Sequence, residues 1–214
     1  MAEQALECNS KIGPFRIPLE ARRQERYSGA DRMKPDFGIA MAETISPKTP
    51  EQLFAFLDEQ GIRVKTVSHP PLYTVADSQS LRGQIEGGHT KNLFLKDRKD
   101  NYFLLTVDEE AVVDLKTIHH RIGAVGKVSF GKPEALLELL GVMPGAVTAF
   151  GPFNDADERV KVFLDSGLMR CKIVNCHPLV NTATTSIASG DLVKFLKATG
   201  HEPVILNLTA ESPN

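Results

Sequence analysis

Cysteine is scarce in this chain, with three residues, Cys8, Cys171 and Cys176, among 214. Their number is odd, and their spacing fits neither a zinc site nor a redox pair. We therefore expect no disulfide framework, and the unpaired cysteines favour a reducing compartment.

Long apolar runs are also absent. No stretch approaches the roughly 20 residues that a membrane-spanning helix needs. Near the start of the chain, Glu3, Glu7 and Lys11 interrupt any signal-peptide core. We therefore expect a cytoplasmic protein that has no membrane partner.

Neither sign of charge dominates the chain. It has 25 Lys and Arg against 27 Asp and Glu, which gives a formal net charge of −2. A protein that binds nucleic acid without sequence preference normally carries a broad basic field. The charge balance excludes such a field, so we expect no DNA partner, but it leaves room for a local basic patch.

The common catalytic signatures are missing too. The sequence has no P-loop, no Gly-x-Ser-x-Gly elbow and no HExxH motif. His119 and His120 are adjacent, so we expect their rings on different sides of a helix, where they do not share a metal. Cys176 and His177 are neighbours in an extended segment and should face opposite ways. We therefore interpret Cys176 as a buried structural residue rather than a nucleophile.

Residues 1–45 lack a regular apolar period, and Pro14, Pro18 and Pro35 interrupt any long helix. We predict a poorly ordered leader in this region. A basic RNA-binding arm and a transit peptide are alternatives, but the interspersed acidic residues argue against both. Met41 is an alternative start of the natural protein.

Residues 46–214 carry the periodic patterns of one folded domain. Thr49 to Gln52 form a capping box, and residues 97–101 are typical of a hairpin turn. Helices are expected at 50–60, 75–84, 112–122, 133–140 and 191–198, and strands at 64–67, 92–96, 102–107, 146–150, 159–164, 172–174, 182–187 and 204–208, with a short strand or a turn at 128–130. This order differs from the regular alternation of a doubly wound sheet. We predict an α+β fold, with a mixed, largely antiparallel sheet wrapped by about five helices.

Core packing does not explain the position of Lys91. It stands near the start of an apolar run of the kind that forms core strands, and lysine is rarely buried without a partner. Its side chain either reaches solvent at the end of the strand or points into a pocket. The preceding Gly87 and Gly88 and the neighbouring Asn92 favour the pocket, where an ammonium beside an amide can bind an anion or an oxyanion.

Two further segments offer polar groups. Residues 145–148 place backbone N–H groups next to a turn, which is either a turn alone or a contact for an oxyanion or a ribose. His177 is held by Pro178, and taken alone it is more often a structural histidine than a catalytic one.

These residues belong to a set of motifs that follow one order along the chain. The motifs are His69-Pro-Pro with Tyr73-Thr74-Val75, then Thr90–Asp97, Gly141–Gly145, Asn154-Asp155 and His177–Thr185. Together they resemble the YbaK/ProX family of aminoacyl-tRNA deacylases from about residue 49 to residue 206. The chain is most similar to the free-standing ProX (PrdX) type, which looks like the editing domain inserted in bacterial prolyl-tRNA synthetases. One position departs from the family pattern, because Ala149 stands where the Gly-x-x-x-Pro loop has its proline.

The resemblance implies an enzyme that hydrolyses alanine mischarged onto proline tRNA in trans. It implies catalytic roles for Lys91, Asn92 and His177, and substrate binding by Gly145, Ala146, Val147, Thr148 and Asn181. An ester of this kind needs neither a metal nor a cofactor, because positioning a water and stabilising the oxyanion can suffice. We therefore expect none.

The implied partners are the acceptor end of the tRNA and, transiently, prolyl-tRNA synthetase. A basic rim for the phosphates is expected, and two groups are candidates: Lys96, Arg98 and Lys99, or Lys194 and Lys197. Two alternatives stay open. One is a deacylase for another small mischarged residue (Cys, Ser or Thr), and the other is a non-catalytic module that binds tRNA or a synthetase.

Overall fold

The computed structural model of the protein describes residues 46–71 and 85–209. The predicted leader at 1–45 and the predicted helix at 75–84 lie outside these residues and stay predictions. In the part of the chain that is described, no helix is long and apolar enough to cross a membrane.

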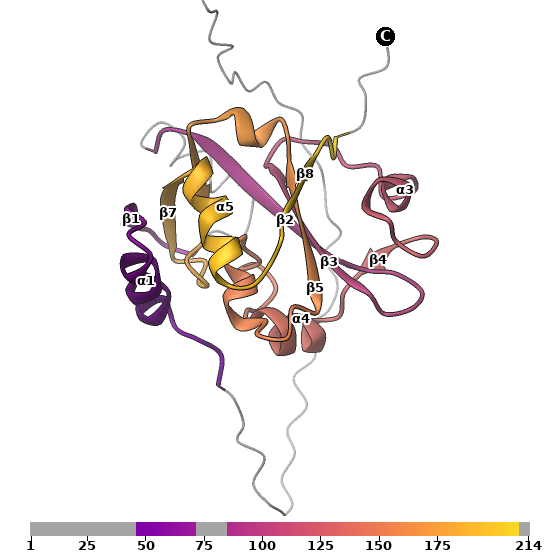
Figure 1. Ribbon diagram of the computed structural model, residues 1–214, viewed down its shortest axis with the longest axis horizontal. Helices are drawn as coiled ribbons and strands as arrows, with labels where there is room; N and C mark the ends of the chain where they lie inside the picture. The colour runs from indigo at the N-terminus through magenta and orange to yellow at the C-terminus, as the bar shows by residue number, and fades with distance from the viewer. Residues whose placement is uncertain (1–45, 72–84, 210–214) are drawn as a thin grey trace, which may run out of the picture. The chain divides into compact units, whose positions relative to one another are not determined.

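The described residues fold into helices and one sheet (Figure 1). The α-helices are α1 (Pro50–Glu59), α3 (Ile118–Ile122), α4 (Pro133–Leu140) and α5 (Ser189–Ala198), and the 3-10 helices are η1 (Gly151–Asn154) and η2 (Leu168–Arg170). The strands are β1 (Val64–Ser68), β2 (Gly88–Lys96), β3 (Tyr102–Asp108), β4 (Ser129–Phe130), β5 (Val160–Asp165), β6 (Ile173–Cys176), β7 (Ala183–Ala188) and β8 (Val204–Leu206).

The sheet is mixed, with the strand order β1-β7-β6-β2-β3-β5-β8, and β4 pairs with β2 off this path. The pairs β1–β7, β6–β7, β2–β3 and β2–β4 are antiparallel. The pairs β2–β6, β3–β5 and β5–β8 are parallel. Antiparallel pairs are the more frequent, and the predicted α+β class with a mixed sheet is confirmed.

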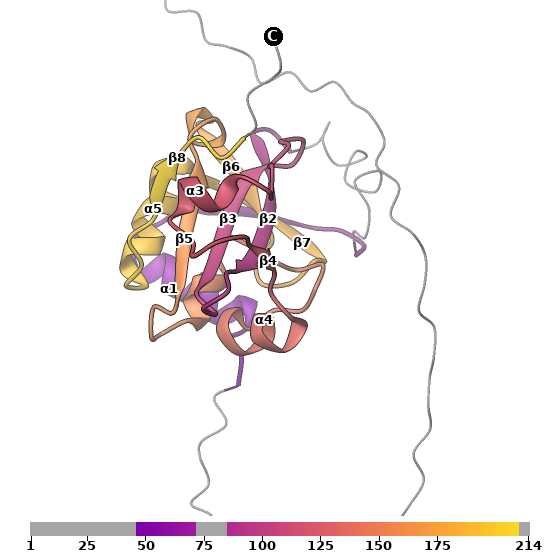
Figure 2. The same ribbon diagram turned by 90° about the vertical axis from the view of Figure 1, so that its right-hand side faces the viewer.

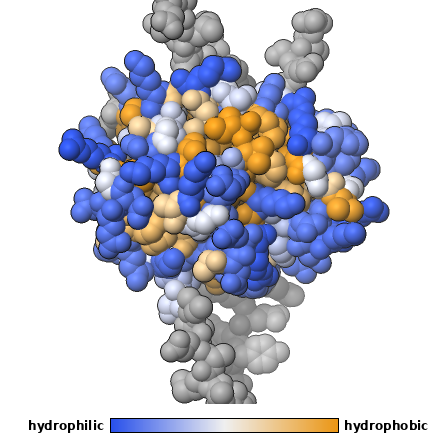
Figure 3. Space-filling model, viewed as in Figure 1, coloured by the Kyte–Doolittle hydropathy of each residue, from blue (hydrophilic) through white to orange (hydrophobic). Residues whose placement is uncertain are grey.

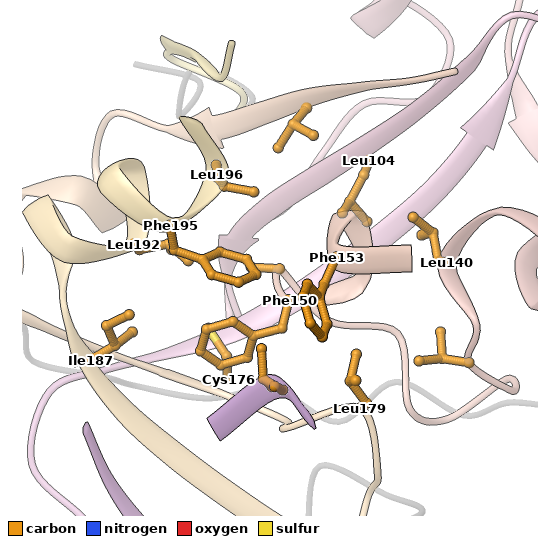
Figure 4. Packing of buried hydrophobic residues seen from close by; sticks show 14 of the residues in the cluster. Leu104, Leu140, Phe150, Phe153, Cys176, Leu179, Ile187, Leu192, Phe195 and Leu196 are labelled. Carbon is orange, nitrogen blue, oxygen red and sulfur yellow. The ribbon is translucent and has the colours of Figure 1, made fainter. Parts of the chain in front are cut away.

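Two apolar cores lie on opposite faces of β2. The larger core contains side chains of α1, α4 and α5, and within it the rings of Phe150 and Phe195 meet edge to face with centroids 5.2 Å apart (Figure 4). The smaller core packs α3 against the sheet. Phe94 belongs to the larger core and Leu95 to the smaller one. Successive side chains of β2 therefore serve different cores, as the alternation of a strand requires.

Strand β8 ends the sheet order, and its first two side chains are partly exposed. Val204 and Ile205 are 46% and 48% exposed, and apolar side chains gather where β8 runs on this face (Figure 3). An exposed apolar edge strand can pair with another chain. With 3 residues, β8 offers only a short edge for such pairing.

The first helix begins as its local sequence predicts. Thr49 Oγ1 accepts a hydrogen bond from the N–H of Gln52 at 3.4 Å, and Gln52 Oε1 accepts one from the N–H of Thr49 at 2.8 Å. After the helix, Gly61 adopts φ +64°, a left-handed conformation that suits glycine. The capping box and the glycine stop are both confirmed.

The predicted helix at 112–122 is wrong in its first half, because only α3 forms. The Asp114 carboxylate accepts from the N–H of Lys116 at 2.9 Å and from Thr117 Oγ1 at 2.8 Å. This local side-chain bonding replaces a helical turn, and Val112 is 71% exposed. The expectation that His119 and His120 face different sides is also wrong, since their ring centroids lie 3.9 Å apart.

The predicted strand at 146–150 is wrong as well, since these residues form no strand. The Thr148 hydroxyl donates to the carbonyl oxygen of His177 at 2.6 Å and accepts from the N–H of Phe150 at 3.2 Å. The loop therefore satisfies its polar groups through a side chain and a distant segment instead of a strand ladder.

The predicted hairpin turn at 97–101 is confirmed, and the buried carboxylate of Asp97 organises it. Asp97 accepts from the N–H groups of Lys99, Asn101 and Val125 and from the amide of Asn101. Burial opposes the charged form of this carboxyl, but the four hydrogen bonds outweigh burial and lower its pKa to about 2. One carboxylate thus joins the hairpin to the chain near Val125.

We predict that Asp97→Asn lowers the free energy of unfolding near neutral pH and removes part of its acid dependence. The folded pKa of about 2 lies below the ordinary 3.8. The carboxylate's contribution is therefore complete above about pH 4 and is lost as the pH falls toward 2. In urea titrations, the difference between the two proteins should shrink as the pH falls through this range.

Asp58→Asn, on the exposed face of α1, is the matched control and should change the free energy of unfolding by less than about 0.5 kcal/mol. A wild-type advantage over Asp97→Asn that is the same at pH 7 and pH 2.5 would contradict the role assigned to the carboxylate.

Candidate functional site

Asn92 connects β2 to the loop at 145–148. Its Oδ1 accepts from Thr106 Oγ1 at 2.8 Å, and its Nδ2 donates to the carbonyl oxygen of Val147 at 3.1 Å. A carbonyl oxygen only accepts, so this pattern fixes which way the amide points. Thr106 lies directly opposite Asn92 on β3. One N–H of the Asn92 amide remains for a further acceptor.

The loop itself is fixed at both ends. Gly145 adopts φ +92°, which only glycine takes without strain, and the N–H of Ala146 donates to the carbonyl oxygen of Met143 at 3.0 Å. Fully buried Thr148 joins the other end of the loop to His177, through the hydroxyl bond described above. The loop is therefore held between β2 and the segment that follows β6.

His177 has a defined tautomer. Its Nδ1 lies 3.0 Å from the carbonyl oxygen of Ala183, and because that oxygen can only accept, Nδ1 carries the hydrogen. The lone pair of the neutral ring is then at Nε2. Burial lowers the pKa of His177, the bond to Ala183 opposes this, and nearby His69 lowers the pKa further. The ring is thus neutral at neutral pH.

His69 lies beside His177, with ring centroids 6.3 Å apart. Its Nδ1 meets the carbonyl oxygen of Pro70 at 2.8 Å, and its Nε2 meets Thr184 Oγ1 at 2.9 Å. No local pattern predicts this neighbour of His177. It depends on the pairing of β1 with β7, in which Ser68 lies opposite Ala183.

Asn181 approaches the same loop, because a Cβ atom placed on Gly145 would lie 3.9 Å from Asn181 Nδ2. Asn92, residues 145–148, His177 and Asn181 therefore gather around one loop. We call this group the loop site. It contains every predicted site residue except Lys91.

Lys91 lies on the other face of β2 from Asn92. It stands opposite Val107, which belongs to the smaller core, and its ammonium donates to the carbonyl oxygen of Ala111 at 2.5 Å. Burial lowers the pKa of Lys91, while the charges of Asp108 and Glu109 raise it. The two acidic neighbours thus favour the charged ammonium at a half-buried position.

Neither the loop site nor the described surroundings of Lys91 contain a set of metal ligands. Within residues 46–71 and 85–209, no three His, Cys, Asp or Glu side chains are close enough together to hold a metal ion. Cys176, next to His177 in the sequence, is buried, and burial raises its thiol pKa to about 12 despite a weak bond from Thr90. A thiol with this pKa is not a nucleophile at neutral pH.

The motifs and the fold define a class of protein that sequence comparison also identifies. The model of the aminoacyl-tRNA editing domain family matches residues 69–195, which is more than half of the chain. The chain belongs to this family, and the predicted resemblance is confirmed.

Named relatives make the membership more specific. The chain is 38% identical over 151 residues to prolyl-tRNA synthetase associated domain-containing protein 1 of Mus musculus, covering 69% of this chain and 89% of the relative. It is 34% identical over 152 residues to the prolyl-tRNA editing protein ProX of Acetoanaerobium sticklandii, covering 71% and 92%.

A solved structure shares the fold. It is described as a candidate trans-editing enzyme for prolyl tRNA synthetase, and it matches with a TM-score of 0.59 at 21% identity. The match covers 78% of this chain and 100% of the other. At this identity the comparison establishes the editing-domain fold alone.

We predict that Thr148→Val destabilises the protein by about 1–3 kcal/mol, because the change leaves the carbonyl of His177 and the N–H of Phe150 without their buried partner. Thr117→Val is the control, since the Thr117 hydroxyl is exposed and water can replace it. Urea unfolding measures both. Equal losses in the two variants would contradict the structural role of the Thr148 hydroxyl.

Proposed function

We propose that the protein is an aminoacyl-tRNA deacylase that acts in trans and hydrolyses the ester of alanine mischarged onto proline tRNA. Family membership supports the reaction class, and the relative from A. sticklandii is named as a prolyl-tRNA editing protein. The observation that carries the proposal in this chain is the loop site. There, hydrogen bonds of Asn92 and Thr148 fix a glycine-containing loop beside a neutral histidine.

The loop site offers donors for the oxyanion. When water attacks the ester carbonyl, negative charge develops on its oxygen, and backbone N–H groups can stabilise that charge. Among the described residues, the N–H groups of Val147 and Thr148 donate to no other group, whereas that of Ala146 is used by Met143. We assign the N–H group of Val147 to the oxyanion, because Val147 is partly exposed whereas Thr148 is fully buried. The remaining N–H of Asn92 would orient the carbonyl or the terminal ribose.

His177 is suited to hold the attacking water. Its Nε2 lone pair can accept a hydrogen bond from that water, because Nδ1–H is engaged by Ala183. Attack forms a new C–O bond at the carbonyl carbon, and collapse of the intermediate breaks the ester C–O bond. The proton released by the water goes to the ribose oxygen that leaves. Neutral imidazole at neutral pH supports this assignment.

We assign Lys91 to a phosphate near the 3′ end of the tRNA rather than to the ester oxygen. Asn92 contacts the loop, and adjacent residues of a strand face opposite ways, so Lys91 approaches the substrate from the other side of β2. Its ammonium is bound to one carbonyl oxygen, which leaves two further N–H donors. A half-buried ammonium attracts an anion more strongly than one in water.

We predict that Lys91→Ala lowers kcat/KM for mischarged alanyl-tRNA by at least tenfold, because it removes this charge. Lys161→Ala, a change to an exposed lysine on β5, should leave kcat/KM within about twofold and serves as the control. Release of radiolabelled alanine measures both. A loss of less than tenfold in Lys91→Ala would remove Lys91 from the proposed site.

Substrate choice should be steric. A synthetase rejects a smaller analogue poorly, since a missing methylene is worth only about 1–3 kcal/mol. A second site that admits only small residues corrects this error. We predict faster hydrolysis of alanyl-tRNA than of prolyl-tRNA, by at least tenfold in kcat/KM. Equal rates for the two would contradict the proposed specificity.

One observation favours a second substrate. Ala149 replaces the proline of the family's loop and is fully buried beside the loop site, so the loop here can differ in shape. A panel with alanyl-, cysteinyl-, seryl- and threonyl-tRNA distinguishes the two candidates. A preference for one of the last three would reassign the substrate, and no turnover on any would favour a module that only binds tRNA or a synthetase.

A further inference from the structure

An exposed basic surface that includes an aromatic residue lies beside β4. Its members are Arg98, Lys99, Lys127, Phe130 and Lys132, all of them exposed. Phe130 is 60% exposed, although large aromatic side chains are usually mostly buried. We call these five residues the β4 surface. In Figures 1 and 2, β4 lies between α3 and α4, at the end of β2 that leads into the hairpin.

Three contacts fix the β4 surface in place. β4 pairs with β2, with Lys96 opposite Ser129. The Asp97 carboxylate accepts from the N–H of Val125 at 2.8 Å and so ties the hairpin to the chain before β4. A Cβ placed on Gly126 would lie 2.7 Å from Arg98 Nε, which means that the guanidinium of Arg98 covers Gly126. The cations thus come from segments that are joined before any ligand binds.

The cations of the β4 surface are not paired with neighbouring carboxylates. The carboxylate of Asp97 is buried and satisfied by four hydrogen bonds. Asp100 pairs with Lys96 at 2.5 Å. Among the described residues, none of the four cations of the β4 surface forms an ion pair with a carboxylate. A chain with a net charge of −2 therefore carries a concentrated basic patch here.

The aromatic residue of the β4 surface lies on the same face of β2 as Lys91. Phe130 stands opposite Leu95 in the antiparallel pair of β4 with β2, and the side chains of opposite residues project to the same face. Lys91 and Leu95 are four residues apart on β2, so they share that face and are separated by about 13 Å along the strand. Asn92 and the loop site lie on the other face. The proposed phosphate site at Lys91 and the ring of Phe130 therefore lie along one face of β2.

We propose that the β4 surface binds the substrate RNA a few nucleotides from its reacting 3′ end, with the four cations on phosphates and Phe130 stacked on a base. The inference rests on the proposed function, because it takes the RNA to be that of an aminoacyl-tRNA. Cations interleaved with an exposed aromatic ring form the usual arrangement for unpaired nucleic acid, since every base has a face on which a ring can stack.

The structure also distinguishes the two basic groups that the sequence suggested for phosphate binding, which are the hairpin group and the lysines of α5. On α5, Lys194 Nζ donates to the carbonyl oxygen of Gln60 at 2.5 Å, and Lys197 pairs with Glu202 at 3.4 Å. Both α5 lysines thus have partners within the protein. They provide a control of equal charge for the pair Lys127 and Lys132 of the β4 surface.

Binding of uncharged proline tRNA, followed by fluorescence anisotropy over a range of salt concentrations, tests the proposal. The variant Lys127→Ala/Lys132→Ala should raise Kd about tenfold at low salt. It should also reduce the slope of log K against log salt by about 1–2, because binding with fewer phosphate contacts releases fewer counterions. Lys194→Ala/Lys197→Ala should stay within about twofold. An unchanged slope in the first variant, or an equal loss in the second, would overturn the proposal.

Phe130 needs a test that separates stacking from charge. Phe130→Ala should weaken tRNA binding about tenfold while leaving the salt slope unchanged, and Phe130→Tyr should restore binding because it keeps the aromatic face. Failure of Phe130→Tyr to restore binding would exclude stacking. Thermal unfolding should be similar for all these variants, since the side chains are exposed.

A kinetic readout separates this inference from the proposed function. The Lys127→Ala/Lys132→Ala variant should raise KM for mischarged tRNA about tenfold with little change in kcat, and should hydrolyse alanyl-adenosine as the wild type does. If the wild type hydrolyses neither substrate yet binds tRNA through the β4 surface, the proposed function fails and the surface stands. If the wild type hydrolyses both substrates and the variant binds tRNA like the wild type, the proposal for the β4 surface is rejected and the proposed function stands.

Discussion

The alternation of side chains along β2 is the constraint on which the rest of the structure depends. Phe94 enters the larger core, whereas Leu95 enters the smaller core and Leu93 packs against it. The same alternation sends Asn92 to the 145–148 loop and Lys91 to the carbonyl of Ala111. A one-residue slip of β2 would exchange both cores and both polar groups at once, so the packing of the strand also fixes the chemistry around it.

Irregular segments in this protein are held by single polar side chains rather than by strand or helix ladders. Thr148 holds the loop site, and Asp97 holds the hairpin beside β4. Asp155 does the same farther away, where it accepts from two backbone N–H groups and meets the buried ring of His201 at 3.2 Å. Buried polar groups of this kind are costly unless fully bonded, so each loop has one preferred conformation.

Sequence predicts the elements here where the signal is local. The capping box at Thr49 needs only neighbouring residues, and so does the hairpin turn at Asp97. The missing strand at 146–150 could not be predicted, because the hydroxyl of Thr148 bonds to a carbonyl 29 residues away. The place of His69 beside His177 likewise depends on the pairing of β1 with β7. The separation of Lys91 from Asn92 follows from alternation alone, whereas the partner of Lys91 depends on the turn that ends at Ala111.

The account centres on the loop site as the place where the ester carbonyl binds. A structure with a non-hydrolysable amide analogue of the alanylated terminal adenosine, carrying its 5′-phosphate, tests this most directly. We expect the carbonyl oxygen of the analogue at about 3 Å from the N–H group of Val147, the Nε2 of His177 facing the carbonyl carbon, and the phosphate near Lys91. A carbonyl oxygen bound by the ammonium of Lys91, with the 145–148 loop left without contact, would contradict the account.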